Sequence, residues 1–323
     1  MKSMGILEEA RRRLGEIPLV EVAARVPLSR YTRFGVGGPA DLWVESGDAE
    51  AFVRALEAAR ATGLATLVMG GGTNLIAADE GYRGIVLRFT GARLAAGGAR
   101  VSAEAGAALA GLVHFTVARG LAGLETLAGI PGWVGGAVYG NAGAYGHAIG
   151  ERVAAVRCFD GRARRVLDRE ACGFAYRESV FKRCREWVIL GVDLELEPGD
   201  ADSLARRVEE IERLREAKFP ASLRCAGSVF KNLLAEGLPV PVPAEVIREG
   251  KVPAAYFLEQ AGVKSLRRGA MRVADYHANL VYNEGGGTAQ DLRALIGEMK
   301  ARVRASLGLE LEEEVQYVGF EEV

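Results

Sequence analysis

Residues 129–146 read GIPGWVGGAVYGNAGAYG, with seven glycines in eighteen positions alongside bulky apolar side chains. Glycine lets a backbone adopt positive φ and approach a ligand closely. Pro131 fixes one φ angle, and Asn141 tolerates left-handed geometry. We call this stretch the second glycine loop, and its composition predicts a rigid turn that can wrap an anion.

A first glycine loop lies about sixty residues upstream, in ATLVMGGGTNLI, residues 65–76. The pattern predicts a buried strand that runs into a glycine turn at residues 70–75, where successive N–H groups can bind an anion. Neither loop fits GxGxxG with a following acidic residue, or GxxxxGK[ST], so ordinary dinucleotide and P-loop sites are disfavoured. Each loop alone could equally be a tight turn between packed strands, whereas the pair favours one diphosphate ligand held at both ends.

Composition narrows the class of protein. The chain has 323 residues, 49% of them hydrophobic, which is enough for two or three domains. Its net charge of −1 argues against nucleic-acid and membrane partners. The four cysteines and three histidines are scattered without metal-ligand spacing, so no metal site is expected. With no apolar run of about 18 residues and a charged start, a cytoplasmic protein is expected.

Periodicity predicts an α+β chain that begins with a βαβ-like unit. Asp48 and Gly63 are expected to bound one helix, and Thr288 and Gly308 the last one. The other expected helices are 5–17, 107–121, 202–217 (with Leu204, Val208, Ile211 and Leu214 inward) and 255–263. The expected strands are 65–69, 84–89, 101–106, 153–159, 164–167, 187–196, one within 275–286, and 309–317, together with a strand, turn and strand over 30–46. Residues 266–273 are expected to be a loop, and the proline-rich segment 236–253 a surface excursion.

Five motifs in order resemble the UDP-N-acetylenolpyruvoylglucosamine reductase family. The two glycine loops resemble its FAD-binding motifs. YRESVFK at 176–182, AGSVFKN at 226–232 and LEEEVQYVG at 311–319 resemble its catalytic motifs. The resemblance runs from Tyr31 to Gly319. The short span between Arg177 and Trp187 resembles the shorter class, which lacks an extra tyrosine loop.

The resemblance implies a two-part FAD-binding unit of the vanillyl-alcohol-oxidase (PCMH) type over 18–215, with parts 18–92 and 93–215. It also implies a substrate-binding domain at 216–312 and a C-terminal strand and tail at 313–323. FAD is expected to bind non-covalently, because the first glycine loop offers no His or Cys. The cofactor-binding residues that the resemblance implies are Gly70, Gly71, Gly72, Thr73, Asn74, Leu75, Gly129, Ile130, Pro131, Gly132, Gly135, Gly136, Asn141, Gly143 and Ala144.

Three residues match the family's catalytic positions. Composition alone would make Arg177 a surface ion pair, Ser228 a turn residue and Glu314 a solvated charge. By resemblance, Arg177 binds the substrate carboxylate through the parallel donors of its guanidinium, and Glu314 faces the same group. Ser228 is the general acid. A serine hydroxyl is a weak acid, and it suits a strongly basic acceptor such as a carbanion.

The implied reaction is part of peptidoglycan precursor synthesis. NADPH reduces FAD and leaves, and UDP-N-acetyl-3-O-(1-carboxyvinyl)glucosamine is then reduced to UDP-N-acetylmuramate. Hydride goes to the methylene carbon, and Ser228 protonates the α-carbon. The implied substrate-binding residues are Tyr145, Lys218, Lys231 and Asn232.

The chain departs from the family pattern at Leu233, at Gln316 and in the insertion at 236–253. A monomer is expected. One alternative is a flavin oxidase or dehydrogenase of the same fold that acts on an alcohol or lactone, and another is a non-catalytic UDP-sugar sensor. His114 is interpreted as a hydrogen-bonded helix residue.

Overall fold

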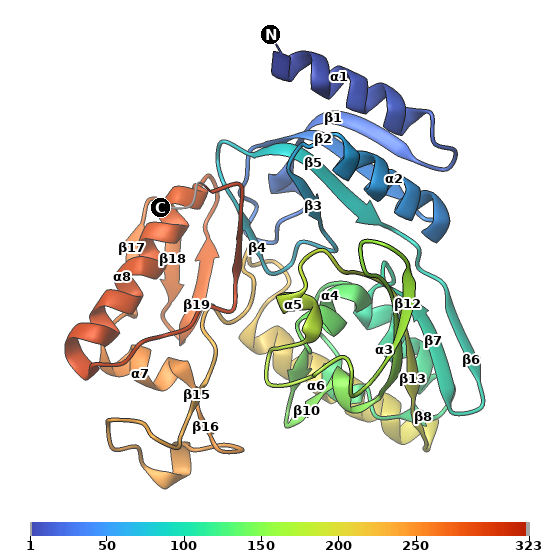
Figure 1. The fold of residues 1–323 in the computed structure, drawn as a ribbon. Coiled ribbons are helices and arrows are strands. Elements are labelled where there is room, and N and C mark those ends of the chain that lie inside the picture. Colours follow the sequence, from blue (N-terminus) through green and yellow to red (C-terminus); the bar gives the residue numbers. More distant parts are fainter. Residues whose placement is uncertain (1, 321–323) are drawn as a thin grey trace. The chain divides into compact units, whose positions relative to one another are not determined.

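The structure is a computed structural model that describes residues 2–320 (Figure 1). In this range the chain forms two compact units, each assembled from segments far apart in the sequence. Unit 1 comprises residues 2–26, Ala40–Gly71 and Arg83–Ala217, and unit 2 comprises Pro27–Pro39, Gly72–Tyr82 and residues 218–320. The chain therefore passes from one unit to the other inside the first glycine loop. The continuous functional domains expected from the sequence stay a prediction.

The first part of unit 1 is a four-stranded sheet covered by helices. The strands, in the order β1-β2-β5-β3, are β1 Glu21–Pro27, β2 Pro39–Ser46, β5 Tyr82–Phe89 and β3 Thr66–Val68. The helices are α1 Lys2–Gly15 and α2 Ala49–Ala61. Asp48 caps α2 by accepting from the N–H groups of Glu50 and Ala51, as predicted. Strand β3 runs parallel to β5, as the βαβ-like pattern predicts.

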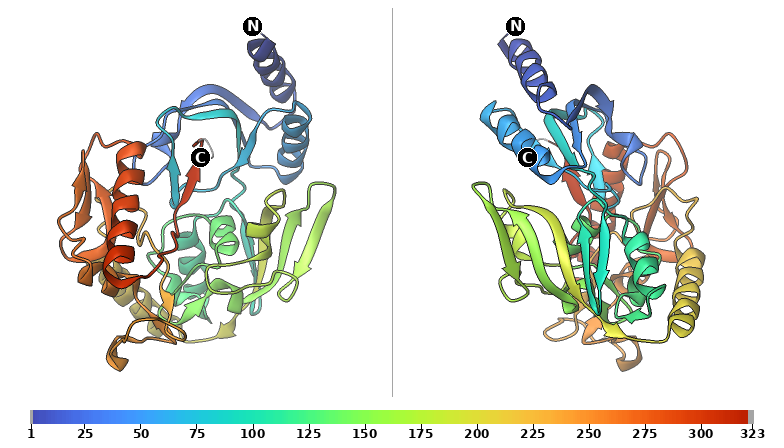
Figure 2. Two further views of the ribbon diagram at one scale, coloured as in Figure 1. Left: turned by 60° about the vertical axis from the view of Figure 1, so that its left-hand side comes forward. Right: turned by 90° about the vertical axis from the view of Figure 1, so that its right-hand side faces the viewer.

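The second part of unit 1 is a five-stranded antiparallel sheet in the order β12-β11-β13-β7-β6. Its strands are β6 Leu94–Gly97, β7 Arg100–Glu104, β11 Val153–Phe159, β12 Arg164–Asp168 and β13 Val188–Glu195. The helices are α3 Leu109–Val117, α4 Val134–Tyr139, α5 Val180–Arg183 and α6 Ala201–Lys218. Helix α4, which lies within the second glycine loop, packs on β13 and β7 (Figure 2). Short pairs join β8 Leu121–Ala122 to β14 Glu197–Pro198 and β9 Gly143–Ala144 to β10 His147–Ala148.

Unit 2 is a small sheet covered by two helices around its own apolar core. The sheet, in the order β17-β18-β19, consists of β17 Arg267–Arg268, β18 Met271–Ala274 and β19 His277–Asn283. The helices are α7 Ala254–Gln260 and α8 Ala289–Leu307. Helix α8 is capped by Thr288 and ends at the left-handed Gly308, as predicted. Two further pairs are β15 Leu233–Leu234 with β16 Lys251–Val252, and β4 Leu75–Ala77 parallel to β20 Gln316–Val318.

One prediction near the start of the chain is wrong, and two strands were not predicted. In residues 30–46 only β2 is a strand, because residues 31–38 fold into turns. There the Thr32 hydroxyl donates to the Val36 carbonyl (2.6 Å) and accepts from its N–H (3.2 Å), which satisfies the backbone locally. Strands β1 and β6 were not anticipated at all.

Further predictions in the second half are wrong. Residues 266–273 contain the β17–β18 hairpin, whose two-residue pairing is too short for a period-2 pattern. The terminal strand is confined to Gln316–Val318. Leu214 is 44% exposed, whereas Val208 and Ile211 of the same helix are buried as expected. The segment 236–253 is not wholly an excursion, because it ends in β16, where Val252 is buried.

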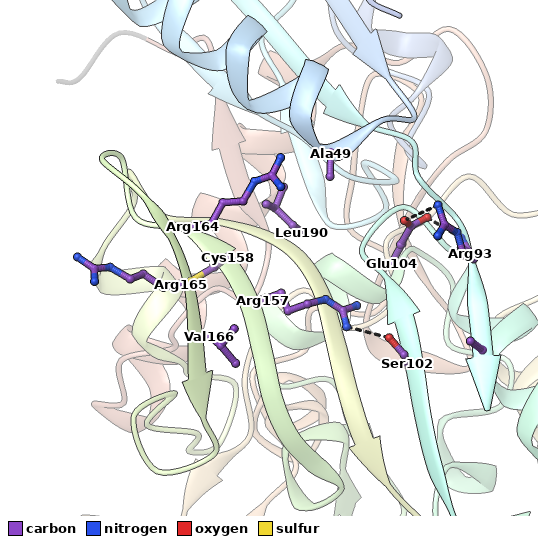
Figure 3. Close-up of a pocket in the computed structure, with 11 residues that line it drawn as sticks. Ala49, Arg93, Ser102, Glu104, Arg157, Cys158, Arg164, Arg165, Val166 and Leu190 are labelled. Atoms are coloured by element: carbon purple, nitrogen blue, oxygen red, sulfur yellow. Dashed lines mark hydrogen bonds and ion pairs between the residues drawn. The ribbon is translucent and has the colours of Figure 1, made fainter. Parts of the chain in front are cut away.

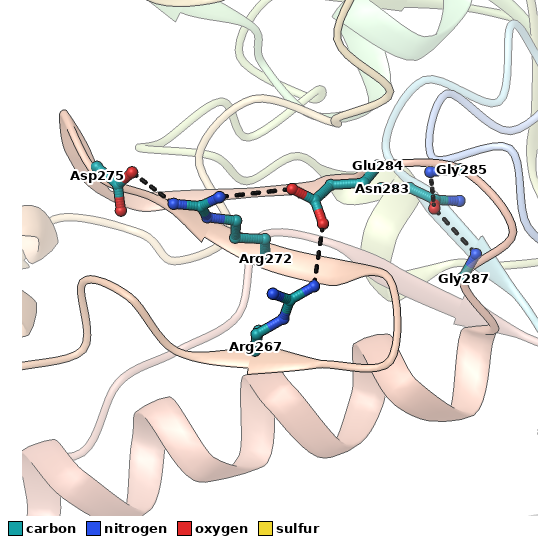
Figure 4. Close-up of polar contacts among 7 residues, drawn as sticks. All are labelled: Arg267, Arg272, Asp275, Asn283, Glu284, Gly285 and Gly287. Atoms are coloured by element: carbon teal, nitrogen blue, oxygen red, sulfur yellow. Dashed lines mark hydrogen bonds and ion pairs between the residues drawn. The ribbon is translucent and has the colours of Figure 1, made fainter.

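The turn after β19 depends on one buried amide (Figure 4). Asn283 Oδ1 accepts from the N–H groups of Gly285 (2.9 Å) and Gly287 (3.0 Å), and its Nδ2 donates to the Phe34 carbonyl (2.9 Å). Figure 4 also shows Arg267 and Arg272 paired with Glu284. The Arg267 side chain is 63% exposed, so its ion pair adds little to stability.

We expect Asn283→Ala to lower the free energy of unfolding by about 2–3 kcal/mol, because three backbone groups lose their partner in a buried setting. Arg267→Ala, in the same hairpin region, is the matched control and should change it much less. Urea unfolding followed by circular dichroism measures both. Equal effects of the two substitutions would contradict the importance assigned to the amide.

Candidate functional site

The two glycine loops touch in unit 1. A side chain at Gly71 would place its Cβ 3.2 Å from Trp133 Cδ1 and 3.4 Å from the Gly132 Cα. Any larger residue there would press into the second loop. The close approach of the two backbones fits the idea that they share one extended ligand, and it explains why glycine stands at position 71.

Arg88 of β5 holds the first glycine loop. The side chain is buried, and its Nε donates to the Gly70 carbonyl at 3.2 Å while Nη1 pairs with Glu45 at 2.7 Å. The guanidinium carbon lies 4.3 Å from the centroid of the Trp133 ring and 5.2 Å from that of Trp43. Sequence reasoning missed this residue. An arginine inside the apolar run GIVLRF was the available signal, because a buried charge needs a dedicated partner.

Arg177 is fixed to the second glycine loop. It has a left-handed backbone, with φ of 57°, and its Nη2 donates to the Gly143 carbonyl at 3.0 Å. Beside it, the Ser179 hydroxyl donates to the Tyr139 carbonyl at 2.7 Å. A non-glycine residue at positive φ is uncommon and marks a conformation imposed by its surroundings. The segment therefore presents the guanidinium in a defined direction.

Several predicted cofactor residues also make contacts within unit 1. The Asn141 amide donates to the Ala175 carbonyl (2.8 Å) and accepts from the Gly150 N–H (3.0 Å), so this side chain ties the second loop to the Arg177 segment. A Cβ at Gly135 would lie 2.9 Å from that of Ala105, so helix packing alone requires glycine there. The contacts of Asn141 and Gly135 with FAD stay a prediction.

Tyr145 forms the tip of a tight turn. It connects β9 to β10 with φ of 52°, followed by Gly146 at 85°. Its side chain is 47% exposed, so it is accessible to a ligand.

Unit 2 brings Ser228 and Glu314 together. The segment that contains Ser228 lies between β19 and the C-terminal segment, because Val229 N–H donates to the Asn279 carbonyl (3.0 Å) and Glu314 N–H donates to the Val229 carbonyl (2.7 Å). A bridge between Phe230 and Glu313 continues this pairing. Two residues about 86 positions apart in the sequence thus become near neighbours through backbone bonds. Arg177 belongs to unit 1, and the predicted convergence of the three catalytic residues stays a prediction.

Asn279 is a second residue that sequence reasoning missed. Its buried amide accepts from the Phe230 N–H and donates to the Phe230 carbonyl, both at 2.9 Å. It therefore locks the segment that carries Ser228 onto β19. The signal was an asparagine in the otherwise apolar strand HANLVYN, where a polar side chain has to find partners.

The predicted substrate-binding residues of unit 2 differ in environment. Lys231 is buried and pairs with Glu312, with Nζ 2.5 Å from Oε1. Asn232 is exposed, and its Oδ1 accepts from the Ala254 N–H at 3.3 Å. Lys218 is exposed next to Phe219. Lys218 and Asn232 are thus exposed to solvent, and Lys231 is buried beside a carboxylate.

A pocket of about 380 Å³ lies elsewhere in unit 1 (Figure 3). It is lined by residues that include four arginines, and three of these pair with carboxylates: Arg93 with Glu104, Arg157 with Asp193 and Arg165 with Asp160. It contains none of the predicted site residues. We therefore do not assign it to the predicted reaction.

Three further observations concern His114, groups that could bind a metal ion, and helices that could span a membrane. His114 pairs with Glu212 on the surface, with 3.1 Å between Nε2 and Oε1, which agrees with a hydrogen-bonded helix residue. Within residues 2–320, no three His, Cys, Asp or Glu side chains are grouped so that they could hold a metal ion. Among the helices of this part of the chain, none combines the length and apolar character that a membrane span needs.

His277, at the start of β19, gives unit 2 a pH-sensitive contact. Burial, with a smaller contribution from Lys218, lowers its pKa from 6.5 to about 4. Its Nδ1 accepts from the Asn279 N–H at 3.1 Å, which requires the neutral ring. Between pH 6.5 and 4 the unfolded chain therefore binds a proton that the folded chain does not.

The free energy of unfolding should consequently be fully retained above pH 6.5 and fall as the pH is lowered toward 4. His277→Gln, which cannot titrate, should show a shallower decline over this interval. Urea unfolding at pH 7, 5.5 and 4.5 tests this. Parallel pH profiles for the two proteins would contradict the account.

Comparisons with known proteins cover nearly the whole chain. Residues 219–318 match the family described as UDP-N-acetylenolpyruvoylglucosamine reductase, C-terminal domain, and residues 40–166 match the FAD binding domain family. The reductase of Solibacter usitatus is 58% identical over 311 residues, which cover 95% of this chain and 100% of that protein. The reductase of Rubrobacter xylanophilus is 40% identical over 91% of this chain and 94% of that protein.

The solved structures give the same result. A crystal structure of UDP-N-acetylenolpyruvylglucosamine reductase from Thermus caldophilus is similar, with a TM-score of 0.72 and 31% identity over 93% of this chain and 99% of that one. The α+β fold class and the family predicted from the five motifs are confirmed. The chain therefore belongs to the UDP-N-acetylenolpyruvoylglucosamine reductase family.

Proposed function

We propose that this chain is an FAD-dependent oxidoreductase that uses NADPH to reduce UDP-N-acetyl-3-O-(1-carboxyvinyl)glucosamine to UDP-N-acetylmuramate, a step of peptidoglycan precursor synthesis. The observation that carries the proposal is 58% identity to a reductase of this name over 95% of the chain. The contact between the glycine loops at Gly71 and Gly132 supports the cofactor assignment. Residues 18–215 would bind FAD, and residues 216–312 with the C-terminal strand would bind the sugar nucleotide.

When bound, FAD supplies hydride transfer from NADPH to the methylene carbon of the enolpyruvyl group. The chain supplies the binding, the orientation and the proton. Arg177 holds the substrate carboxylate with parallel N–H donors, and the bond from its Nη2 to the Gly143 carbonyl fixes the direction of the guanidinium. The preorganised donor stabilises the negative charge that grows on that carboxylate.

Ser228 and Glu314 complete the chemistry. Hydride addition leaves an enolate whose α-carbon is strongly basic, and the Ser228 hydroxyl donates the proton to it. Glu314 stabilises the same enolate by donating a hydrogen bond from its carboxyl group. The backbone bond between Glu314 and Val229 supports this pairing of roles, because it keeps Glu314 next to the segment that carries the proton donor.

The oligomeric state, the location in the cell and the class of partner are also proposals. We propose that the enzyme works as a monomer in the cytoplasm, where its nucleotide substrate and NADPH are found. The near-neutral charge, from 41 basic and 42 acidic residues, supports a small-molecule substrate rather than a nucleic acid or a membrane.

We expect Arg88→Ala to reduce FAD retention at least tenfold, because the first glycine loop loses the bond at Gly70 and the stacking on Trp133. Flavin absorbance per polypeptide after purification measures this. The matched control is Arg83→Ala, on the same strand, where the side chain is 67% exposed. Full flavin content in the Arg88 variant would show that the loop needs no such support.

We expect Ser228→Ala to retain NADPH-dependent bleaching of the flavin and to lose turnover with the enolpyruvyl sugar nucleotide by about a thousandfold, because the α-carbon lacks its proton donor. Stopped-flow absorbance separates the two steps. Ser222→Ala, on an exposed turn nearby, is the control. Normal turnover would remove the acid role, and bleaching by an alcohol or lactone instead of NADPH would favour an oxidase of the same fold.

A further inference from the structure

We propose that Asn74 is a positioning residue that fixes the backbone of Glu314 to the first glycine loop, so that cofactor binding at this loop and placement of Glu314 are coupled. The proposal rests on the function given above and adds a role for a residue that the sequence motif alone assigns to the cofactor. All the contacts that carry it lie within unit 2.

Two hydrogen bonds join Asn74 to the C-terminal segment. Its Nδ2 donates to the Glu314 carbonyl at 2.8 Å, and its own carbonyl accepts from the Gln316 N–H at 3.0 Å. Immediately after Asn74, strand β4 runs parallel to β20, with Leu75 opposite Gln316 and Ile76 opposite Tyr317. The side-chain bond thus reaches beyond the start of this strand pairing, to Glu314, which lies two residues before Gln316.

The backbone of Glu314 is held through both its N–H and its carbonyl group. Its N–H donates to Val229, the neighbour of Ser228, and its carbonyl accepts from Asn74. The first bond is made by backbone groups alone. The second depends on the Asn74 amide, so a single substitution releases the carbonyl of Glu314 and leaves this part of the chain held on one side only.

The conformation of the first glycine loop directs the Asn74 side-chain amide toward Glu314. Gly72 has φ of 67°, and its carbonyl accepts from the Leu75 N–H at 3.4 Å, which closes a turn around Thr73 and Asn74. Because the Asn74 Nδ2 is directed to Glu314, the anion-binding capacity of the turn comes from its backbone N–H groups. A ligand that orders this turn therefore also orders the donor on which Glu314 depends.

The test uses Asn74→Ala and Asn74→Asp in the full-length, FAD-loaded protein. Aspartate has nearly the same shape but no donor, so both variants should behave alike. We expect turnover with the enolpyruvyl sugar nucleotide, measured with excess FAD, to fall 10- to 100-fold in both variants and to fall further than the rate of flavin bleaching by NADPH. The difference between the two losses separates a positioning role from cofactor binding.

Amide hydrogen exchange supplies a readout that is independent of activity. In the parent protein, adding FAD to the FAD-free form should slow exchange at Glu314 and Gln316, and the Asn74 variants should lose this effect and exchange at least tenfold faster there. Thr288→Ala is the matched control, because it removes another side-chain bond to backbone in unit 2, at the Asp291 N–H. It should leave exchange at these two amides unchanged.

Two results would overturn the proposal. Unchanged exchange at Glu314 and Gln316 in the Asn74 variants would show that the amide does not hold the segment. Loss of flavin together with full recovery of turnover in excess FAD would make Asn74 a cofactor ligand. If the parent protein itself fails to reduce the enolpyruvyl sugar nucleotide, the proposed function fails, and the exchange data still decide whether Asn74 positions Glu314.

Discussion

The pairing of the C-terminal segment with two distant stretches of chain is the constraint on which unit 2 depends. The Glu314 N–H bonds the Val229 carbonyl, and β20 lies parallel to β4 directly after the first glycine loop. Neither contact is local in sequence, so each one forms only when unit 2 folds. The proposed acid Ser228, the proposed carboxylate Glu314 and residues 72–75 of the first glycine loop are therefore part of one cooperative structure.

In unit 1, two glycine-rich stretches are held in fixed conformations by side chains. These are arginine side chains, one buried and one half-buried, that bond to carbonyl groups of the loops. Arg88 binds the first loop at Gly70, and Arg177 binds the second at Gly143. The glycines permit the close approach, and the arginines supply the rigidity that glycine lacks.

The sequence predicted the parts of the fold that depend on local chemistry. The caps at Asp48 and Thr288 were found because short polar side chains before an apolar helix satisfy its first N–H groups. The β17–β18 hairpin and the course of residues 31–38 were missed, because they depend on packing and on local side-chain bonds that no periodicity reports. Leu214 was misplaced because the last turns of α6 are exposed.

For the candidate site, the motif resemblance predicted the reactive residues, and no pattern predicted the residues that support them. Arg88 and Asn279 interrupt apolar strands, and only the tertiary structure reveals the carbonyl groups that they bond.

If NADPH and the enolpyruvyl sugar nucleotide react in turn with one bound flavin, an anaerobic titration of the purified protein, followed by flavin absorbance, tests this most directly. We expect a yellow protein that is bleached by one equivalent of NADPH and regains its colour with one equivalent of the sugar nucleotide, with release of the lactyl ether. A flavin that stays bleached after the sugar nucleotide is added would contradict it.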